Sequence, residues 1–295
     1  MKSHPILVTG ATGNVGQEII KTLYEQQHLV RAAVVSEDDA KRLPAPVPWH
    51  IFDFTDPATY QTAFAGVKKM FLMRPPHISN IERDMKPAID CAVQSGVEHI
   101  VFLSLLGAEK NKVVPHAKVE KLLLASPVSC TMLRCGFFMQ NLSTTHLQDI
   151  QEHNDIFIPA GRGKTAFIDV RDIAAVAAKT LTESGHEDQA YPLTGSEALD
   201  YYQVAQIMTQ QLKRSIGYSN PSLPRFVWHF WRRGYSLGYI GVVSAIYTTT
   251  RFGLAETVTP HAKQFLGRDP ISFQQFVQDY APIWANTHPK GTKKR

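Results

Sequence analysis

The chain has 295 residues, of which 44% are hydrophobic and 19% charged, and its formal net charge is +5 at pH 7. A chain of this size and apolar content can bury the core of one large α/β domain, or of a domain with a smaller second lobe. The three cysteines have no neighbours at metal-ligand spacing, no apolar run is long enough to span a bilayer, and no signal-peptide pattern is present. We therefore expect a reduced, cytoplasmic protein without a metal site.

The stretch Ile6–Gly16, ILVTGATGNVG, predicts a strand, a tight glycine turn and a helix. Three apolar residues lead into Gly10, Gly13 and Gly16, and a helical apolar pattern follows at once. Glycine accepts a positive φ and has no Cβ to hold phosphates away from backbone amides, and a helix N-terminus favours an anion. The stretch therefore indicates a dinucleotide pyrophosphate site. The alternative is an ordinary strand–helix turn, because the spacing is Gly-x-x-Gly-x-x-Gly and not Gly-x-Gly-x-x-Gly.

A second buried strand is expected over Leu29–Val35, followed by the polar cluster Ser36-Glu37-Asp38-Asp39. In nucleotide-binding folds a residue about 20 positions past the glycines meets the adenosine ribose, where an acid favours NAD and a base accommodates the 2′-phosphate of NADP. The acids favour NAD here, Lys41 and Arg42 could reach a phosphate, and Ser36 could serve either cofactor. In a simpler interpretation the acids only begin a helix. The choice between NAD and NADP stays open.

Further strands are expected at Trp49–Phe52, Lys69–Met73 and His99–Leu103, with one long helix from Ser79 to Gln94 before the last of them. Asp53, after the first of these strands, could accept a hydrogen bond from the adenine amino group or simply cap a loop. Ser104 follows the strand that ends at Leu103. Because ligands bind beyond the carboxyl ends of the strands in open parallel sheets, Ser104 stands where chemistry is expected.

The alternation of strands and helices continues with strands at Cys130–Leu133 and Ala190–Thr194 and a helix at Asp172–Thr182. This order predicts an α/β fold, a Rossmann-type doubly wound parallel sheet with helices on both faces. We expect residues 1–155 to form a dinucleotide-binding domain whose sheet is completed by part of residues 156–212. Residues 213–288 then form a smaller, mostly helical substrate-covering lobe, and residues 289–295 form a basic disordered tail.

Aromatic and basic residues are interleaved between Arg214 and Arg251, a segment with five arginines and no acid. Such a pattern is compatible with a nucleic-acid surface or with a helix that lies on a membrane. Aromatic residues at helical spacing more often pack inside a lobe, and we favour that interpretation for Phe226, Trp228, Phe230, Trp231, Tyr235 and Tyr239. Neither nucleic acid nor a membrane is therefore expected as a partner.

Seven stretches carry a more specific signal: VTGATGNVG (8–16), FDFTDP (52–57), VFLSLLGAE (101–109), HAKVEKLL (116–123), LRCGFFMQNL (133–142), FIDVRDIAAVAA (167–178) and YPLTGSEALDYYQVAQIM (191–208). Together they resemble the NmrA-like branch of the atypical short-chain dehydrogenase/reductase superfamily, especially its NAD(P)H quinone oxidoreductase-like members. The resemblance implies a Rossmann-type domain that binds NAD or NADP, with a small C-terminal lobe closing a cleft over the nicotinamide.

Carried over position by position, the resemblance also implies a cofactor site. It places Gly10, Thr12, Gly13, Asn14 and Val15 around the pyrophosphate, Asp53 near the adenine, Leu72, Met73 and Arg74 along the cofactor, and Ser104 beside the nicotinamide ribose. Phe137, Phe138 and Asn141 belong to the loop covering the nicotinamide ring, and Phe138 and Asn141 are the candidate substrate contacts. Many relatives carry a basic residue at the end of the second strand, where this chain has Val35, and this difference puts NADP preference in doubt.

The candidate catalytic residues are the second place where this chain differs from the family pattern. Ordinary short-chain dehydrogenases use Tyr-x-x-x-Lys, in which the lysine lowers the pKa of the tyrosine, whereas this chain has His116-Ala-Lys118 with no tyrosine nearby. His116 could act as an acid near neutral pH and Lys118 could hold the ribose, so Ser104, His116 and Lys118 are the candidate catalytic residues. Residues two apart diverge on a helix, so one of the pair must face elsewhere. Alternatively, His116 caps the helix and Lys118 is solvated.

These observations predict an NAD(P)H-dependent oxidoreductase that transfers hydride to a quinone or another small conjugated carbonyl. Such a reaction needs little help from a side-chain acid, because the cofactor carries the hard chemistry and the protein orients it. The missing tyrosine keeps a second hypothesis open, a non-catalytic NAD(P)-binding redox sensor or transcriptional regulator of the NmrA type. The sequence is compatible with a homodimer.

Overall fold

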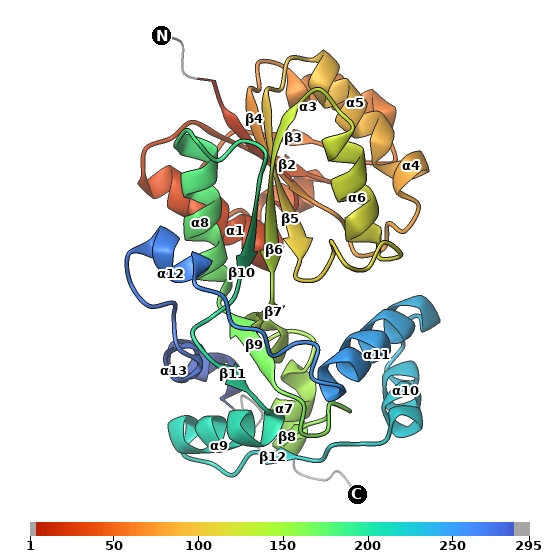
Figure 1. The fold of residues 1–295 in the computed structure, drawn as a ribbon, viewed down its shortest axis with the longest axis vertical. Helices are drawn as coiled ribbons and strands as arrows, with labels where there is room; N and C mark the ends of the chain where they lie inside the picture. Colours follow the sequence, from red (N-terminus) through yellow and green to blue (C-terminus); the bar gives the residue numbers. More distant parts are fainter. Residues whose placement is uncertain (1–3, 286–295) are drawn as a thin grey trace, which may run out of the picture. The chain divides into compact units, whose positions relative to one another are not determined.

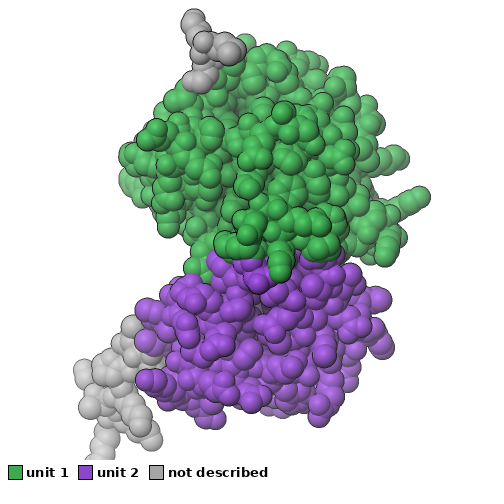
Figure 2. Space-filling model, turned by 60° about the vertical axis from the view of Figure 1, so that its left-hand side comes forward, with its two compact units in different colours: residues 1–135, 170–193, 260–268 green, residues 136–169, 194–259, 269–295 purple. Residues whose placement is uncertain are grey.

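The computed structural model describes residues 4–285, and the chain divides into two compact units. Unit 1 takes the residues up to 135, together with 170–193 and 260–268, and unit 2 takes 136–169, 194–259 and the residues from 269 onward (Figure 2). The functional boundaries expected after residues 155, 212 and 288 stay a prediction, and the tail 289–295 lies outside the described residues. Within the described range, no helix combines the length and the apolar character needed to cross a membrane.

Unit 1 is built on a seven-stranded sheet in the order β10-β6-β5-β4-β1-β2-β3, with every pair of neighbours parallel. The strands are β1 Ile6–Val8, β2 Val30–Val34, β3 Trp49–Ile51, β4 Lys69–Met73, β5 His99–Leu105, β6 Ser129–Cys135 and β10 Gln189–Leu193. This order confirms the predicted doubly wound parallel sheet. The chain leaves β1 for β2 and β3 on one side and returns to β4 on the other, so the strand order reverses at β1.

Helices cover both faces of this sheet (Figure 1). α1 (Asn14–Glu25) and α8 (Val170–Thr182) pack together on one face, and α12 (His261–Leu266) packs on α8. The other face carries α3 (Tyr60–Phe64), α5 (Lys86–Gln94) and α6 (Pro115–Leu124), whose apolar residues share one core with the strands. The short helices α2 (Glu37–Ala40), η1 (Pro57–Thr59) and α4 (Ile81–Asp84) lie in connections between strands.

The single helix expected over residues 79–94 is wrong, because α4 and α5 are separate and Met85 lies between them. Pro87 explains the break. It has no N–H to donate within a continuous helix, but it is tolerated in the first turn of α5, where that N–H would have no partner.

A second correction concerns Ser104, which lies inside β5 and not beyond its end. β5 continues to Leu105, and Ser104 is paired with Arg134 of the neighbouring strand β6. Side chains at paired positions of a parallel sheet point to the same face. Ser104 and Arg134 are therefore neighbours on one face.

Unit 2 has small sheets and five α-helices within the described range. β7 (Phe137–Phe138) pairs with β9 (Thr165–Ile168), β9 pairs with β11 (Ala198–Leu199), and β8 (Asp155–Ile156) pairs with β12 (Gly217–Tyr218). The helices are α7 (Leu147–His153), α9 (Tyr201–Leu212), α10 (Leu223–Arg232), α11 (Leu237–Arg251) and α13 (Phe273–Trp284), and the 3₁₀ turn η2 (Met139–Leu142) precedes α7.

The aromatic residues of α10 divide between the core and the surface. Phe226 and Phe230 are fully buried, as predicted, whereas Trp228 is 54% and Trp231 59% exposed. The two tryptophans are three residues apart and so share the outward face of the helix, where the Arg232 guanidinium lies over the Trp228 ring at 4.9 Å from its centroid. The prediction that all these aromatic side chains pack inside the lobe is therefore wrong for the two tryptophans.

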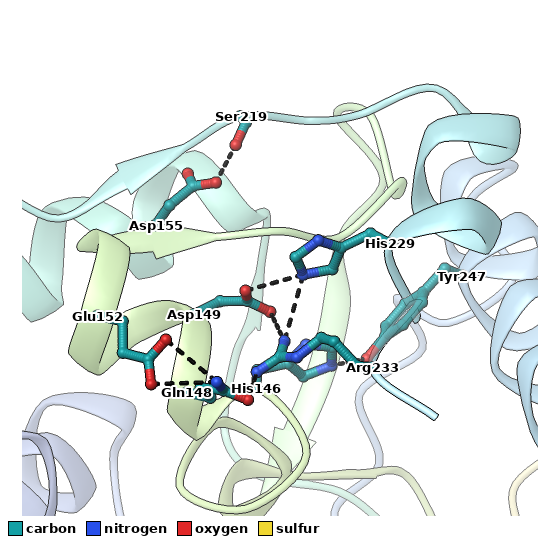
Figure 3. A network of polar contacts seen from close by, with 9 residues as sticks. All are labelled: His146, Gln148, Asp149, Glu152, Asp155, Ser219, His229, Arg233 and Tyr247. Carbon is teal, nitrogen blue, oxygen red and sulfur yellow. Dashed lines mark hydrogen bonds and ion pairs between the residues drawn. The ribbon is translucent and has the colours of Figure 1, made fainter. Parts of the chain in front are cut away.

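A polar network joins α7 to α10 inside unit 2 (Figure 3). The buried carboxylate of Asp149 accepts hydrogen bonds from His229 Nε2 at 2.9 Å and from Arg233 Nη1 at 2.7 Å. Beside them, His146 Nε2 lies 2.5 Å from the buried hydroxyl of Tyr247. Burial, with a smaller contribution from the positive charge of Arg233, lowers the pKa of His146 to about 3. Arg233 thus serves the interior of the unit.

Candidate functional site

The glycine turn after β1 has a backbone that side chains would disrupt. Gly10 has a φ of +63°, and a Cβ built there would lie 2.1 Å from Met73 Cε. A Cβ on Gly16 would lie 2.1 Å from the carbonyl oxygen of Gly10. Gly16 therefore lets the first turn of α1 lie directly against the glycine turn, as the Rossmann fingerprint requires of its third glycine.

The N-terminus of α1 is suited to an anion. The N-cap residue is Gly13, which has no side chain. The amides of the first turn, at Asn14, Val15 and Gly16, therefore meet no competing hydrogen-bond acceptor from an N-cap side chain. The first N–H groups of a helix have no intrahelical partner, and the helix dipole adds partial positive charge. A pyrophosphate fits this bare, glycine-lined helix end at the switch point of the sheet.

Thr9 joins the end of β1 to the end of β4. Its hydroxyl donates to the Phe71 carbonyl at 3.0 Å and accepts from the Met73 amide at 2.8 Å. This pairing holds Met73 beside Gly10. Leu72 is completely buried in the core of unit 1, so of the predicted pair Leu72 and Met73 it is Met73 that lies at the turn.

Arg74 and His116 lie close together beyond the end of β4. Arg74 Nη1 donates to the carbonyls of Pro75 and Ile78, at 2.8 and 2.6 Å, while its buried Nε has no hydrogen-bond partner in the described part of the chain. The ring of His116 lies 6.1 Å from that of Phe102. Burial, and then the charge of Arg74, lower the pKa of His116 to about 3. His116 is therefore neutral at neutral pH.

Ser104 is one of three polar side chains that meet on the buried face of β5. Its hydroxyl donates to Glu120 Oε1 at 2.5 Å, and both residues are almost fully buried, Ser104 at 3% and Glu120 at 4% exposure. Arg134 donates to the same carboxylate with Nε at 3.0 Å and Nη2 at 2.7 Å.

Glu120 and Arg134 were missed at the level of sequence. Arg134 was visible as the single charged residue of the apolar run TMLRC, whereas Glu120 stands beside Lys121 in VEKLLL and so gave a weaker signal. A charge in such a position is buried only when it is paired. Glu120 also lies four residues after His116, on the same side of α6.

Lys118 faces away from this group, in agreement with the expected divergence from His116. Together with Lys121 and Leu122 it lines a surface pocket of about 650 Å³ that α6 shares with Ile81 and Lys86. The residues of α6 that pack in the core are Val119 and Leu123. Lys118 is thus exposed on the outer side of the helix.

The acidic residues after β2 begin the short helix α2, as the simpler interpretation of this cluster predicted. Ser36 caps α2, because its Oγ accepts from the Asp39 amide at 3.1 Å. The nearby bases are paired, Lys41 with Asp38 at 2.7 Å and Arg42 with Asp39 at 3.2 Å. Val35, at the end of β2, is 64% exposed.

Asp53 caps its own loop. Its Oδ1 accepts from the amide and the hydroxyl of Thr55, at 2.8 and 2.7 Å. The cofactor roles assigned to Ser36 and Asp53 stay predictions.

The residues expected at the nicotinamide and the substrate belong to unit 2. Phe137 packs against its core, and the alternation of side chains along β7 directs Phe138 to the opposite face. Asn141 lies in η2, where its carbonyl accepts from the His146 amide at 3.1 Å. Gln140 Nε2 donates to Asp169 Oδ1 at 3.0 Å and helps fix this turn. Within residues 4–285, no group of three or more His, Cys, Asp or Glu side chains is arranged to hold a metal.

The glycine turn, the bare end of α1 and the parallel order of the sheet are those of a nucleotide-binding fold, and the sequence profile of the NmrA-like family matches residues 2–227, well over half of the chain. The chain belongs to the NmrA-like family. The resemblance seen in the seven stretches is thereby confirmed.

Relatives of this NmrA-like chain include named reductases. The NAD(P)H azoreductase of Xenophilus azovorans is 31% identical over 282 residues, which cover 94% of this chain and 98% of that protein. Quinone oxidoreductase 2 of Escherichia coli (strain K12) is 30% identical over 223 residues, covering 74% and 78%. The crystal structure of an NADPH-dependent quinone oxidoreductase from Escherichia coli, complexed with NADPH, superposes with a TM-score of 0.83 at 26% identity and covers 93% of this chain and 99% of that one.

Proposed function

We propose that this chain is an NAD(P)H-dependent oxidoreductase that reduces a quinone or another small conjugated acceptor. The observation that carries the proposal is the glycine turn against α1, where a Cβ at Gly16 would overlap the Gly10 carbonyl and the first turn of the helix has no side-chain cap. The reductase relatives supply the reaction class. When bound, a reduced nicotinamide cofactor supplies the hydride.

The chain's own residues bind and orient. The amides at Asn14, Val15 and Gly16 hold the pyrophosphate, and Met73, fixed by Thr9, borders the turn. Ser104 on β5 lies on the far side of β4 from β1, toward the nicotinamide half of a cofactor whose adenosine lies over β2. Phe138 and Asn141 are our candidates for contact with the acceptor.

The proton that completes the reduced acceptor comes from solvent in this proposal. Hydride carries two electrons and one proton, and a quinone needs one further proton to become the hydroquinone. His116 is neutral because of its lowered pKa, and Lys118 faces the pocket beside α4, so neither is placed as a cationic acid beside Ser104. Quinone oxygens are reduced to weakly acidic phenols, for which water suffices.

We propose that the chain uses both cofactors with little preference. Lys41 and Arg42 are engaged by Asp38 and Asp39, and Val35 provides no charge at the end of β2. No basic side chain there is held ready for the 2′-phosphate, while Glu37 is exposed and lies outside both ion pairs, so it can turn toward a ribose hydroxyl.

The test is to mix purified protein with NADH or NADPH and a panel of quinones and azo dyes, and to follow loss of the reduced cofactor. Cofactor oxidation that depends on the acceptor supports the proposal. Tight cofactor binding without turnover of any acceptor contradicts it and supports the redox sensor or regulator instead.

Two further properties belong to the proposal. We propose a cytoplasmic location, which the three unpaired cysteines Cys91, Cys130 and Cys135 support. We also propose a homodimer, to be measured by light scattering. Fractionation of expressing cells tests the location.

A further inference from the structure

We infer that Glu120 and Arg134 are positioning residues that fix the direction of the Ser104 hydroxyl, so that Ser104 meets the nicotinamide half of the cofactor as a hydrogen-bond acceptor. The inference rests on the proposed function, because it assumes a dinucleotide over the ends of β1, β4 and β5. It assigns a role to two residues that the sequence did not single out.

The three side chains form a closed set on unit 1. Ser104 and Arg134 occupy paired positions on β5 and β6, and α6 brings Glu120 over them. Glu120 Oε1 accepts from Ser104 Oγ at 2.5 Å and from Arg134 Nε at 3.0 Å, and Oε2 accepts from Arg134 Nη2 at 2.7 Å. The Nη1 of Arg134 lies 3.5 Å from Glu109 Oε2, so the guanidinium faces carboxylates on two sides.

This geometry decides where the hydroxyl proton goes. A guanidinium is always charged and donates only, and its two parallel hydrogen bonds use both oxygens of the Glu120 carboxylate as acceptors. An ionised carboxylate accepts only. The one proton of Ser104 must therefore point inward to Glu120, and both lone pairs of its oxygen remain for a ligand.

The consequence is a requirement on the ligand. Ser104 can accept from a donor, but it cannot pass a proton to an acceptor, because Glu120 has none to return. The nicotinamide riboside half of a dinucleotide offers two kinds of donor, the ribose hydroxyls and the carboxamide N–H₂. The adenosine half lies toward β2, which β4 and β1 separate from β5 in the sheet, and is not affected.

The experiment compares equilibrium dissociation constants of reduced cofactor and of ADP, which lacks both the nicotinamide and its ribose, for wild type, Ser104→Ala, Glu120→Gln and the double variant. A glutamine amide can donate to Ser104, which releases the hydroxyl proton to point outward. We expect each single variant to bind reduced cofactor about tenfold more weakly, and the double variant no more weakly than either, since both remove one interaction. ADP binding should stay within about twofold of wild type in every case.

Lys121→Gln, at an exposed position of α6 next to Glu120, is the matched control and should bind like wild type. If Glu120→Gln does not fold because Arg134 loses its partner, the variant Glu120→Gln/Arg134→Gln removes both charges together and carries the same expectation. The 3-acetylpyridine analogue, which replaces the amide N–H₂ by a methyl group, identifies the donor. If Ser104→Ala leaves its affinity unchanged the carboxamide is the donor, and if Ser104→Ala weakens it the ribose is.

Three results would overturn the inference alone: Glu120→Gln binding reduced cofactor as wild type does, single effects that add in the double variant, or an equal loss of ADP binding. The last would mark a structural role for the pair. If wild-type protein binds neither reduced cofactor nor ADP, it is the proposed function that fails.

Discussion

Replacing Gly16 by alanine should damage the cofactor site through a single methyl group. The added Cβ would lie 2.1 Å from the Gly10 carbonyl oxygen and 2.8 Å from its carbon, and it meets backbone, which cannot rotate away. To reach the 3.0 Å that real Cβ contacts respect, the turn and the helix must separate by about 0.9 Å.

The cost can be set against a matched control. Gly241 lies in α11, and a Cβ there would meet nothing within 4 Å. Alanine is the better helix former, so Gly241→Ala should stabilise the protein by about 0.5–1 kcal/mol. Gly16→Ala has the same intrinsic gain, but an overpacking cost of about 1–3 kcal/mol opposes it and turns the net effect toward destabilisation.

The effect on binding should exceed the effect on stability. A shift approaching an ångström displaces the amides of the first turn from the phosphates, and we expect cofactor affinity to fall by at least about tenfold. Urea unfolding and titration with NADPH and NADH measure the two quantities, with Gly241→Ala carried through both. A folded Gly16→Ala protein with wild-type affinity for both cofactors would refute the placement of the pyrophosphate on this turn.

Other predictions concern the titratable and buried groups. The pKa of His146 is about 3 in the folded protein and about 6.5 in the unfolded chain, so on acidification the unfolded chain binds a proton at this histidine before the folded protein does. Protonation of His146 in the unfolded chain should therefore lower the free energy of unfolding by about 2 kcal/mol between about pH 7 and pH 5. The loss should be smaller in His146→Gln. Asp149→Asn leaves Arg233 and His229 without their buried carboxylate and should lower the free energy of unfolding by about 3–5 kcal/mol. Glu152→Gln, at an exposed position of the same helix, is the control and should leave the free energy of unfolding nearly unchanged. The steady-state rate of His116→Gln should follow the same pH profile as wild type, since a neutral imidazole contributes no titration near neutrality; loss of a limb of the profile would restore His116 as an acid. Only Cys91 should react with a thiol reagent in the native protein, because burial raises the pKa of Cys130 to about 11 and that of Cys135 further still.

The parallel sheet could be predicted because its central strands β1, β4 and β5 are mostly buried and read as largely apolar runs. The run at Lys69–Met73 has the bounds of β4, and the run at Ile6–Val8 has those of β1. Pro87 was visible in the sequence, but a proline marks equally well a break in a helix and the first turn of a new one. The two-residue strands β7 and β8 gave no signal, because a strand of that length has no period to detect.

The sequence could predict the part of the candidate site that depends on the backbone, which is the glycine turn. Glycine spacing revealed the turn, whereas the partners of Ser104 depended on which residues meet across β5, β6 and α6, and that is a property of the assembled sheet. The lowered pKa of His116 likewise follows from burial and from Arg74, 42 positions earlier in the chain, and not from its neighbours in sequence. For Trp228 and Trp231, helical spacing predicted that the two side chains share one face of a helix, but it could not decide whether that face is buried or exposed.

The order in which the chain is synthesised has a consequence for how its two units form. Unit 1 draws its edge strand β10 from residues 189–193, after the first segment of unit 2 has been translated, and the helix α12 from residues 261–266, after most of unit 2 has been translated. While the ribosome is still making residues 136–188, the strand β6 presents an unpaired edge, and its partner does not yet exist. Neither unit is one continuous stretch of the chain. Recombination between the genes of relatives at a point between β1 and α12 would therefore join parts of a unit from two different proteins, so we expect this region to be inherited whole.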